Sequence, residues 1–374
     1  MRVGRRNPWT PAGGHDRVGT PADSAGGPGP EEPSLTTAST SGPDAAPIAG
    51  KVLLLTLGGT ISMVGHDGGA VVRLNGADLL ADATASEGAP QVVVRDVRAV
   101  PSAHLTFGDV LEIVATADEA VAAGARGVVL TQGTDTLEES AFLLELLWQH
   151  PVPFVVTGAM RNPSLPGADG PANITAAVRV ASDERARERG VLVVFNDEIH
   201  AATHVRKTHS MSTATFGSPD VGPIGHVVEG IARFHATTPR PRPISDLDPQ
   251  LVAGTRVALH TVTMDDDGAQ LAGLADTHDG LVVAAFGVGH VPGAMAPTLG
   301  ELADAMPVVL TSRTGAGPVL ADTYGAPGSE RDLLRRGLIN GGFLHPYKVR
   351  VLLRLLLASG AGPDEIRQRL AELG

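Results

Sequence analysis

Two apolar runs in the sequence each lead into a Gly-Thr pair. Residues 53–61 read LLLTLGGTI, and residues 128–136 read VVLTQGTDT. Continuous apolar runs of this kind predict strands that are buried on both faces, as in a parallel sheet. Because parallel strands end at the same edge of a sheet, Thr60 and Thr134 are expected near one edge. Folds of this class place their functional sites there.

The second run is followed by a helix signal. Thr136 and Glu139 have the spacing of a capping box, and apolar residues follow at helical intervals, at Phe142, Leu143, Leu146 and Leu147. We therefore expect Thr134 and Asp135 between a strand end and a helix N-terminus. Adjacent carboxylates at Glu138 and Glu139 are interpreted as favourable charge in the first helical turn, and not as a catalytic pair.

A glycine-rich turn after a strand is also found in nucleotide-binding folds. The dinucleotide fingerprint G-x-G-x-x-G and the phosphate-loop ending G-K-[ST] are both absent here, since Gly59 is followed by TISM. A dinucleotide-dependent oxidoreductase would also need an acidic residue after the next strand, and none is convincing. We expect no cofactor.

The length of 374 residues is sufficient for two domains. A tail rich in Pro, Gly, Ser and Thr is expected to be disordered over 1–48. A larger N-terminal catalytic domain with a flavodoxin-like or Rossmann-like parallel sheet is expected over 49–236. A proline-rich linker follows at 237–254, and a smaller α/β domain covers 255–374, with strands near 257–260, 280–287 and 307–311.

Charge and cysteine content exclude several kinds of partner. The formal net charge is −12 and no basic cluster occurs, which argues against nucleic acid and anionic membrane surfaces. The chain contains no cysteine, so disulfides and thiolate metal sites are excluded. Three arginines near the start are not followed by an apolar segment, and no apolar run reaches about 18 residues. We expect neither a signal peptide nor a membrane span.

Two polar groups invite a metal interpretation. His200, His204 and His209 are close in sequence, but their spacing matches no zinc pattern and no acidic partner accompanies them. Residues 265–267 are three consecutive aspartates, which are interpreted as a solvated turn. We expect no bound metal.

Taken together, the motifs resemble those of the bacterial asparaginase/glutaminase family, whose signatures are T-G-G-T-I-like and H-G-T-D-T-like segments. The resemblance covers roughly residues 51–374. Further matching segments are VTGAMR at 156–161, GADGPAN at 167–173, RGVLVVFND at 189–197 and KT at 207–208.

The resemblance implies roles for particular residues. Thr60 would be the nucleophile, and Thr134, Asp135 and Lys207 would form a set in which the lysine takes a proton from Thr134. The substrate-binding residues that it implies are Gly59, Ser102, Ala103, Gly133, Thr134 and Asp135. Ser102 would hydrogen-bond the substrate α-carboxylate, and Asp135 would pair with the α-ammonium group.

Some positions depart from the family pattern. In the family, the loop after the first threonine, residues 62–69 here, usually carries a tyrosine, but the only tyrosines in this chain are Tyr324 and Tyr347. His66 lies in this loop and invites the role, but it is interpreted as a surface histidine without one. The tyrosine's role is therefore vacant or filled differently. Gln132 stands where histidine is more common, and Ala103 where glutamine is frequent. The second departure bears on tolerance for glutamine as a substrate.

The implied activity is hydrolysis of L-asparagine by a cytoplasmic homo-oligomer, a dimer of dimers, with a minor glutaminase activity. The C-terminal domain would reach the partner subunit's site through residues 289–292 and through an acidic residue within 324–332. Two alternatives on the same fold remain. One is a non-catalytic amino-acid sensor, and the other is a subunit of a transfer-RNA amidotransferase.

Overall fold

The structure, a computed structural model, describes residues 47–58, 63–66, 69–72 and 90–373. The expected tail falls almost wholly outside these residues. The larger sheet of the described chain has eight strands. In order across the sheet they are β12 (Ile231–Phe234), β11 (Gly225–Val228), β8 (Glu198–Ala201), β7 (Val191–Phe195), β6 (Phe154–Thr157), β5 (Gly127–Thr131), β1 (Val52–Thr56) and β4 (Val92–Asp96).

Five neighbouring strands of this sheet, β4, β1, β5, β6 and β7, are parallel, and β8, β11 and β12 extend the sheet in antiparallel fashion. Numbered by their sequence among the five, the parallel strands have the order 2-1-3-4-5, which is the flavodoxin-like doubly wound topology. The strand order reverses between β1 and β5. The expected parallel-sheet fold of the N-terminal domain is confirmed.

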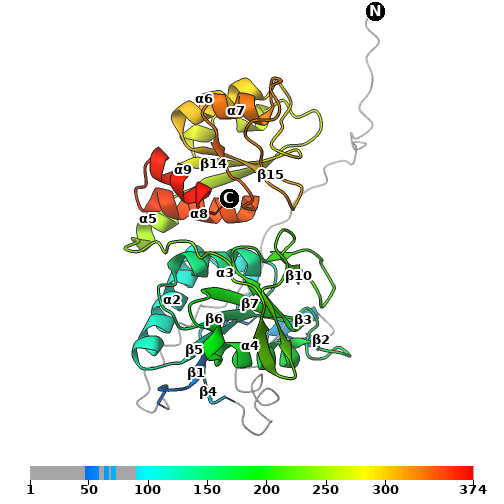
Figure 1. Cartoon of the computed structure of the whole chain (residues 1–374), viewed down its shortest axis with the longest axis vertical. Coiled ribbons are helices and arrows are strands. Elements are labelled where there is room, and N and C mark those ends of the chain that lie inside the picture. Colours follow the sequence, from blue (N-terminus) through cyan, green and yellow to red (C-terminus); the bar gives the residue numbers. More distant parts are fainter. Residues whose placement is uncertain (1–46, 59–62, 67–68, 73–89, 374) are drawn as a thin grey trace, which may run out of the picture. The chain divides into compact units, whose positions relative to one another are not determined.

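Helices cover both faces of this sheet (Figure 1). The helices α2 (Phe107–Ala122) and α3 (Leu137–Leu147) lie on one face, and α4 (Gly170–Ala181) lies on the other. Successive residues of a strand point to opposite faces. In β1, Leu53 and Leu55 accordingly pack in the core with α2 and α3, while Val52 and Leu54 pack with α4. Burial on both faces explains the continuous apolar sequence.

The helix starts show one expectation to be wrong. Thr106 caps α2, because its Oγ1 accepts a hydrogen bond from the Asp109 amide and the Asp109 carboxylate accepts one from the Thr106 amide. Thr136 occupies the same position before α3, but its side chain makes no capping hydrogen bond. Its hydroxyl instead donates to the backbone oxygen of Ser102 at 2.9 Å. The predicted capping box is therefore absent, although the helix begins where expected.

The smaller sheet consists of four parallel strands: β13 (Val257–Thr261), β14 (Gly280–Ala285), β15 (Val308–Ser312) and β16 (Ile339–Asn340). Three of them correspond to the strands expected from sequence. The helices of this half are α5 (Pro249–Gly254), α6 (Ala296–Ala305), α7 (Glu330–Arg335), α8 (Pro346–Ala358) and α9 (Pro363–Ala371). The first of these helices lies within the segment interpreted as a linker.

Short elements complete the described chain. The hairpin of β2 (Met63–His66) and β3 (Gly69–Val72) occupies the segment that was expected to be a loop. A second two-stranded ribbon is formed by β9 (Arg206–Lys207) and β10 (Phe216–Gly217). Single turns of 3-10 helix are η2 (Ser102–His104), η3 (Glu184–Ala186), η4 (Ala269–Leu271) and η5 (Leu274–Asp276). Within the described part of the chain, no helix is both long and apolar enough to cross a membrane.

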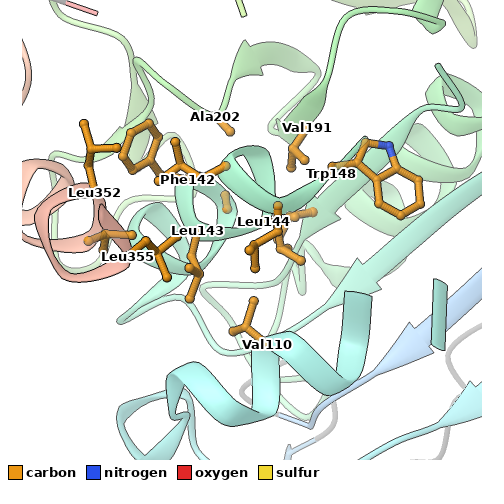
Figure 2. Close-up of a cluster of buried hydrophobic side chains, with 14 of the residues drawn as sticks. Val110, Phe142, Leu143, Leu144, Trp148, Val191, Ala202, Leu352 and Leu355 are labelled. Atoms are coloured by element: carbon orange, nitrogen blue, oxygen red, sulfur yellow. The ribbon is translucent and has the colours of Figure 1, made fainter. Parts of the chain in front are cut away.

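One continuous core connects α3 with α8. Figure 2 shows Phe142, Leu143 and Leu144 of α3 together with Leu352 and Leu355 of α8. All five side chains are almost fully buried. The position of α8 is therefore set by α3, the helix that begins beside Asp135.

Candidate active site

The strand-order reversal brings the two Gly-Thr segments together. Thr56 is opposite Thr131 in the register of β1 and β5, and the Leu57 amide donates to the Thr131 oxygen at 3.0 Å. The loops that follow β1 and β5 therefore begin next to each other, at the same edge of the sheet. Gly58 has φ +83°, in the left-handed region that favours glycine. Gly59 and Thr60 follow and lie outside the described residues, so their roles stay predictions.

Three of the four residues predicted to be catalytic meet at this edge. The Lys207 Nζ donates to Thr134 Oγ1 at 2.9 Å and to Asp135 Oδ1 at 2.8 Å. Thr134 is buried, the Lys207 side chain is 16% exposed, and the Asp135 side chain is 73% exposed. The amine thus joins a buried hydroxyl to a carboxylate that solvent or a ligand can reach.

The hydroxyl of Thr134 has a second neighbour that the sequence argument did not assign. Thr134 Oγ1 donates to the sulfur of Met160 at 3.4 Å. Met160 belongs to the loop after β6, and this loop is held by Asp169, whose carboxylate accepts from the Met160 amide at 3.0 Å and from the Arg161 amide at 2.9 Å. Both Met160 and Asp169 lie in segments that match the family pattern, which is the only signal that points to them.

Ser102 contacts the turn between β5 and α3. Its Oγ accepts a hydrogen bond from the Asp135 amide at 3.2 Å, and only 2% of the residue is exposed. Gly133 is required at this contact, because a Cβ there would lie 2.8 Å from Ser102 Oγ. No acceptor for the Ser102 hydroxyl proton occurs among the described residues. Ala103, in contrast, is exposed in η2.

Gln132 supports the turn from inside the protein. Its Oε1 accepts from the Ser140 hydroxyl at 2.9 Å, and its Nε2 donates to the Gly133 oxygen at 3.3 Å. Gln132 and Ser140 are both buried. The amide therefore ties the turn to α3 without entering the site.

The electrostatic setting comes from α3. Its free N–H groups give the helix N-terminus a partial positive charge, and Thr134 and Asp135 lie directly before it. A partial positive charge here favours negative charge that develops on a bound reactant. The arrangement offers a buried hydroxyl, an amine that can exchange a proton with it, and an exposed carboxylate suited to a cationic ligand group.

Charged residues behind the site were not predicted. Glu138, interpreted above as a helix-start charge, is 6% exposed, and its Oε2 lies 3.9 Å from Arg206 Nε. Lys348 of α8 is 1% exposed. Burial raises the pKa of the Glu138 carboxyl and lowers the pKa of the Lys348 amine to about 7. The sequence signal for Lys348 was its place on the apolar face of α8, with Leu352 and Leu355.

The candidate metal groups show other contacts. His200 is fully buried, with Nδ1 3.0 Å from Ser218 Oγ and Nε2 3.1 Å from Glu198 Oε2. Asp266, expected in a solvated turn, is largely buried and lies 2.7 Å from His260 Nε2. In the part of the chain that the structure describes, no three His, Cys, Asp or Glu side chains are grouped so as to hold a metal ion.

Comparison with known proteins identifies the family. Residues 51–240 match the family described as "Asparaginase, N-terminal", and residues 256–370 match the "Glutaminase/Asparaginase C-terminal domain". The chain belongs to the asparaginase family. These two matches include both sheets and all the described residues of the candidate site.

Individual members of the asparaginase family align over most of the chain. A probable L-asparaginase of Deinococcus radiodurans is 37% identical over 72% of this chain and 82% of its own length. The crystal structure of a probable cytoplasmic L-asparaginase from Campylobacter jejuni superposes with a TM-score of 0.75 at 29% identity, covering 86% of this chain and 99% of that one. A glutamyl-tRNA(Gln) amidotransferase subunit from Haloquadratum walsbyi is 32% identical, covering 86% of this chain and 74% of its own.

Proposed function

We propose that this protein hydrolyses the side-chain amide of L-asparagine to L-aspartate and ammonia, with Thr60 as the nucleophile. The observation that carries the proposal is the position of Lys207 Nζ, within hydrogen-bond distance of both Thr134 Oγ1 and Asp135 Oδ1. A threonine hydroxyl becomes a useful proton carrier only beside a base, and an amine at 2.9 Å meets that condition. Thr134, Asp135 and Lys207 lie at the edge of the sheet where β1 ends, and the chain continues from β1 to Thr60.

In the first step the Thr60 oxygen adds to the carboxamide carbon. The substrate oxygen becomes negatively charged and is stabilised by backbone N–H groups near Gly59 and Thr134, beside the positive end of α3. The carbon–nitrogen bond then breaks. The hydroxyl proton of Thr60 leaves with the nitrogen as ammonia, and an ester joins the β-carbonyl carbon to Thr60.

The second step is hydrolysis of this ester. A water molecule gives one proton to Thr134 Oγ1 as Thr134 passes its own proton to neutral Lys207 Nζ, and the water oxygen attacks the ester carbon. The ester bond breaks, Thr60 recovers a proton from Lys207 through Thr134, and aspartate is released. Asp135 stabilises the ammonium form of Lys207 between these transfers.

Two residues at the turn between β5 and α3 are proposed to bind the α-amino and α-carboxylate groups of the substrate. Asp135 presents an exposed carboxylate for the α-ammonium group. Ser102 has a hydroxyl proton without an acceptor among the described residues, and that proton suits the α-carboxylate. Gly133 allows Ser102 to come this close. The small Ala103 leaves the adjoining position without a polar contact, so we propose at most a minor glutaminase activity.

Two other functions on this fold are weighed against the hydrolase. The amidotransferase subunit of Haloquadratum walsbyi shows that a relative can serve a tRNA-dependent reaction. The net charge of −12 disfavours a tRNA-docking surface here. A non-catalytic amino-acid sensor would need Asp135 and Ser102 to bind its ligand, but it would not need the Lys207 amine beside the Thr134 hydroxyl. We also propose a homo-oligomer built as a dimer of dimers, which the family resemblance implies. A cytoplasmic location is proposed by analogy with the Campylobacter jejuni protein, which is described as a probable cytoplasmic L-asparaginase.

Ammonia release tests the reaction class. The purified protein is expected to release ammonia from L-asparagine, to release much less from L-glutamine, and to release none when Thr60 is replaced by alanine. Coupled enzymatic detection of ammonia measures all three, with D-asparagine as the stereochemical control. If folded protein releases no ammonia from any of these amides, the result would contradict the proposal and favour the amino-acid sensor.

Replacing Gly133 by alanine tests the role of Ser102. The added Cβ would lie 2.8 Å from Ser102 Oγ, so the serine must move and its contact with the substrate carboxylate is weakened. Hydrogen bonds to charged groups contribute about 1.5–3 kcal/mol, so KM for L-asparagine should rise about 10- to 100-fold. Gly254→Ala is the control, because nothing lies within 4 Å of a Cβ there. An unchanged KM in G133A would remove Ser102 from substrate binding.

A further inference from the structure

Lys348 of α8 carries a buried amine that the proposed mechanism does not use. The residue is 1% exposed, and burial lowers the pKa of its amine to about 7. Burying an amine is costly unless hydrogen-bond acceptors replace the water that it loses. The acceptors of Lys348 therefore indicate what this residue does.

Both acceptors belong to one turn of the backbone. Lys348 Nζ donates to the backbone oxygens of Ala202 and Val205, each at 2.6 Å. Ala202 and Val205 are themselves buried. In the described part of the chain, no other donor is hydrogen-bonded to either oxygen. A buried carbonyl without a partner is unfavourable, so both carbonyls of this turn depend on Lys348.

The turn joins β8 to β9 and leads directly to Lys207. At its start, the Ala202 amide donates to the Val191 oxygen of β7 at 3.0 Å. At its end, the Val205 amide donates to the Ala201 oxygen at 3.1 Å. Val205 is two residues before Lys207 in the sequence. The backbone that enters β9 is therefore held by the large sheet at one end and by α8 at the other.

The residue between Val205 and Lys207 has a separate contact with the C-terminal domain. Arg206 Nη1 donates to the backbone oxygen of Gly315, in the loop after β15. Gly315 has φ +95°, and a Cβ there would lie 2.6 Å from Arg206 Nη1, so glycine allows this approach. The C-terminal domain thus contacts both residues that immediately precede Lys207.

The Lys207 side chain extends from this backbone to two partners. Its Nζ lies 2.9 Å from Thr134 Oγ1 and 2.8 Å from Asp135 Oδ1. Hydrogen bonds from nitrogen to oxygen span only about 2.7–3.2 Å. On the far side of Lys207, the Thr208 amide donates to the Thr215 oxygen at 2.7 Å. The position of the β9 backbone therefore decides whether the amine meets both partners at once.

We propose that Lys348 is the positioning residue for Lys207 in the amide-hydrolysis site. By holding the Val205 carbonyl, it fixes the backbone from which the Lys207 side chain reaches Thr134. Because α8 belongs to the C-terminal domain and Lys207 to the N-terminal one, this contact couples the second domain to the site. The inference rests on the proposed function for its consequence in catalysis, but not for its contacts.

The kinetics of Lys348→Met give the first test. Methionine fills much of the space but has no N–H group, so the two backbone oxygens lose their donor and the turn moves. A displacement of about 1 Å can cost roughly 10²-fold in rate. We expect kcat for L-asparagine to fall by about that factor. KM should change less than about 3-fold, because neither Ser102 nor Asp135 belongs to the turn.

Arg354→Met is the matched control. Arg354 lies on the same helix and donates through Nε and Nη2 to the Val252 oxygen, at 3.1 and 2.8 Å. Its replacement also removes two hydrogen bonds between α8 and a backbone oxygen, but this oxygen belongs to α5 and not to the turn before Lys207. We expect kcat to stay within about 2-fold of the native value. Equal losses of kcat in K348M and R354M would overturn the positioning role, because general loosening of α8 would then explain both.

A second test does not depend on activity. The chain contains three lysines, at 51, 207 and 348, so lysine-selective isotope labelling gives few NMR signals, which single lysine variants can assign. In Lys348→Met, the backbone amide signal of Lys207 should shift as the turn moves, and its Cε signal should shift as Nζ leaves Thr134. Arg354→Met should change neither signal.

The outcomes separate this inference from the proposed function. Unchanged Lys207 signals in Lys348→Met would overturn the positioning role, and so would changed signals with an unchanged kcat. If the native protein hydrolyses none of the amides, the proposed reaction fails, and the Lys207 signals still decide whether Lys348 positions the amine.

A milder variant keeps the test decisive if Lys348→Met does not fold. Lys348→Gln retains two N–H groups, but its side chain ends one bond short of the native amine. The turn must therefore move to keep its donor, and both Lys207 signals should shift while kcat falls. Unchanged signals and unchanged kcat in K348Q would overturn the proposal.

Discussion

Lys207→Met and Thr60→Ala are each expected to lower kcat for L-asparagine by about 10²-fold or more. For Lys207 the reason is geometric. Its Nζ lies 2.9 Å from Thr134 Oγ1, and methionine has a similar length but cannot exchange a proton. Loss of a positioned acid–base group typically costs about 10²- to 10⁴-fold. For Thr60 the reason is chemical, because alanine cannot form the ester.

The measurement is initial rates over a range of substrate concentration, together with thermal unfolding of each variant. Lys51→Met is the matched control for Lys207. Lys51 directly precedes β1, at the edge of the sheet opposite the site, and its replacement should leave kcat unchanged. Full activity in either K207M or T60A would remove that residue from the mechanism. A burst of one equivalent of ammonia followed by arrest in K207M would place the lysine in ester hydrolysis alone.

Phe142→Ala is expected to lower the free energy of unfolding by about 3–5 kcal/mol, the usual cost of deleting a buried phenyl ring. Phe142 is fully buried, and Figure 2 shows its ring in the cluster with Leu352 of α8 and Ala202. The ring also lies 5.7 Å from Lys348 Nζ. The cavity would therefore loosen the contact between α3 and α8 and the turn before Lys207.

Denaturant titration followed by circular dichroism measures this change. Phe343→Ala is the control, because that side chain is 51% exposed and its loss should change the free energy of unfolding by no more than about 0.5 kcal/mol. Equal stability losses in the two variants would contradict the idea that the α3–α8 core dominates. We also expect the kcat of F142A to fall below that of F343A in dilute denaturant, since the turn before Lys207 rests on this core.

Much of the fold follows from local pattern. The apolar runs at β1 and β5 could be predicted because central parallel strands are buried on both faces, and every residue of these two strands is buried. The helix after Asp135 could be predicted from its apolar spacing. Its capping box could not, because the Glu139 amide donates to the backbone oxygen of Thr136 at 3.1 Å, while the Thr136 hydroxyl is turned to donate to the backbone oxygen of Ser102, 34 residues away in sequence. A contact with a residue so distant in the sequence is not visible in a four-residue motif.

In the candidate site, too, some features could be predicted from the sequence and others could not. The residue types that end the strands could be identified before any fold was known, and resemblance supplied Thr134, Asp135, Lys207 and Ser102 as members of one site. The burial of Glu138, with its Oε2 3.9 Å from Arg206 Nε, emerged only from the packed structure. Glu138 and Glu139 are equivalent residue types at a helix start, and their burial differs because the helix turns by about 100° per residue against a packed neighbour.

Lys348 shows the limit of local reasoning most clearly. It lies 141 positions after Lys207 in the sequence, in a helix whose pattern predicts packing alone. Its contacts depend on α8 lying against α3, so that its amine donates to the backbone oxygens of Ala202 and Val205. Periodicity fixes which face of a helix is buried, because it reflects one repeating geometry. Which buried groups meet across that face depends on the packing of whole elements, and only the folded chain determines it.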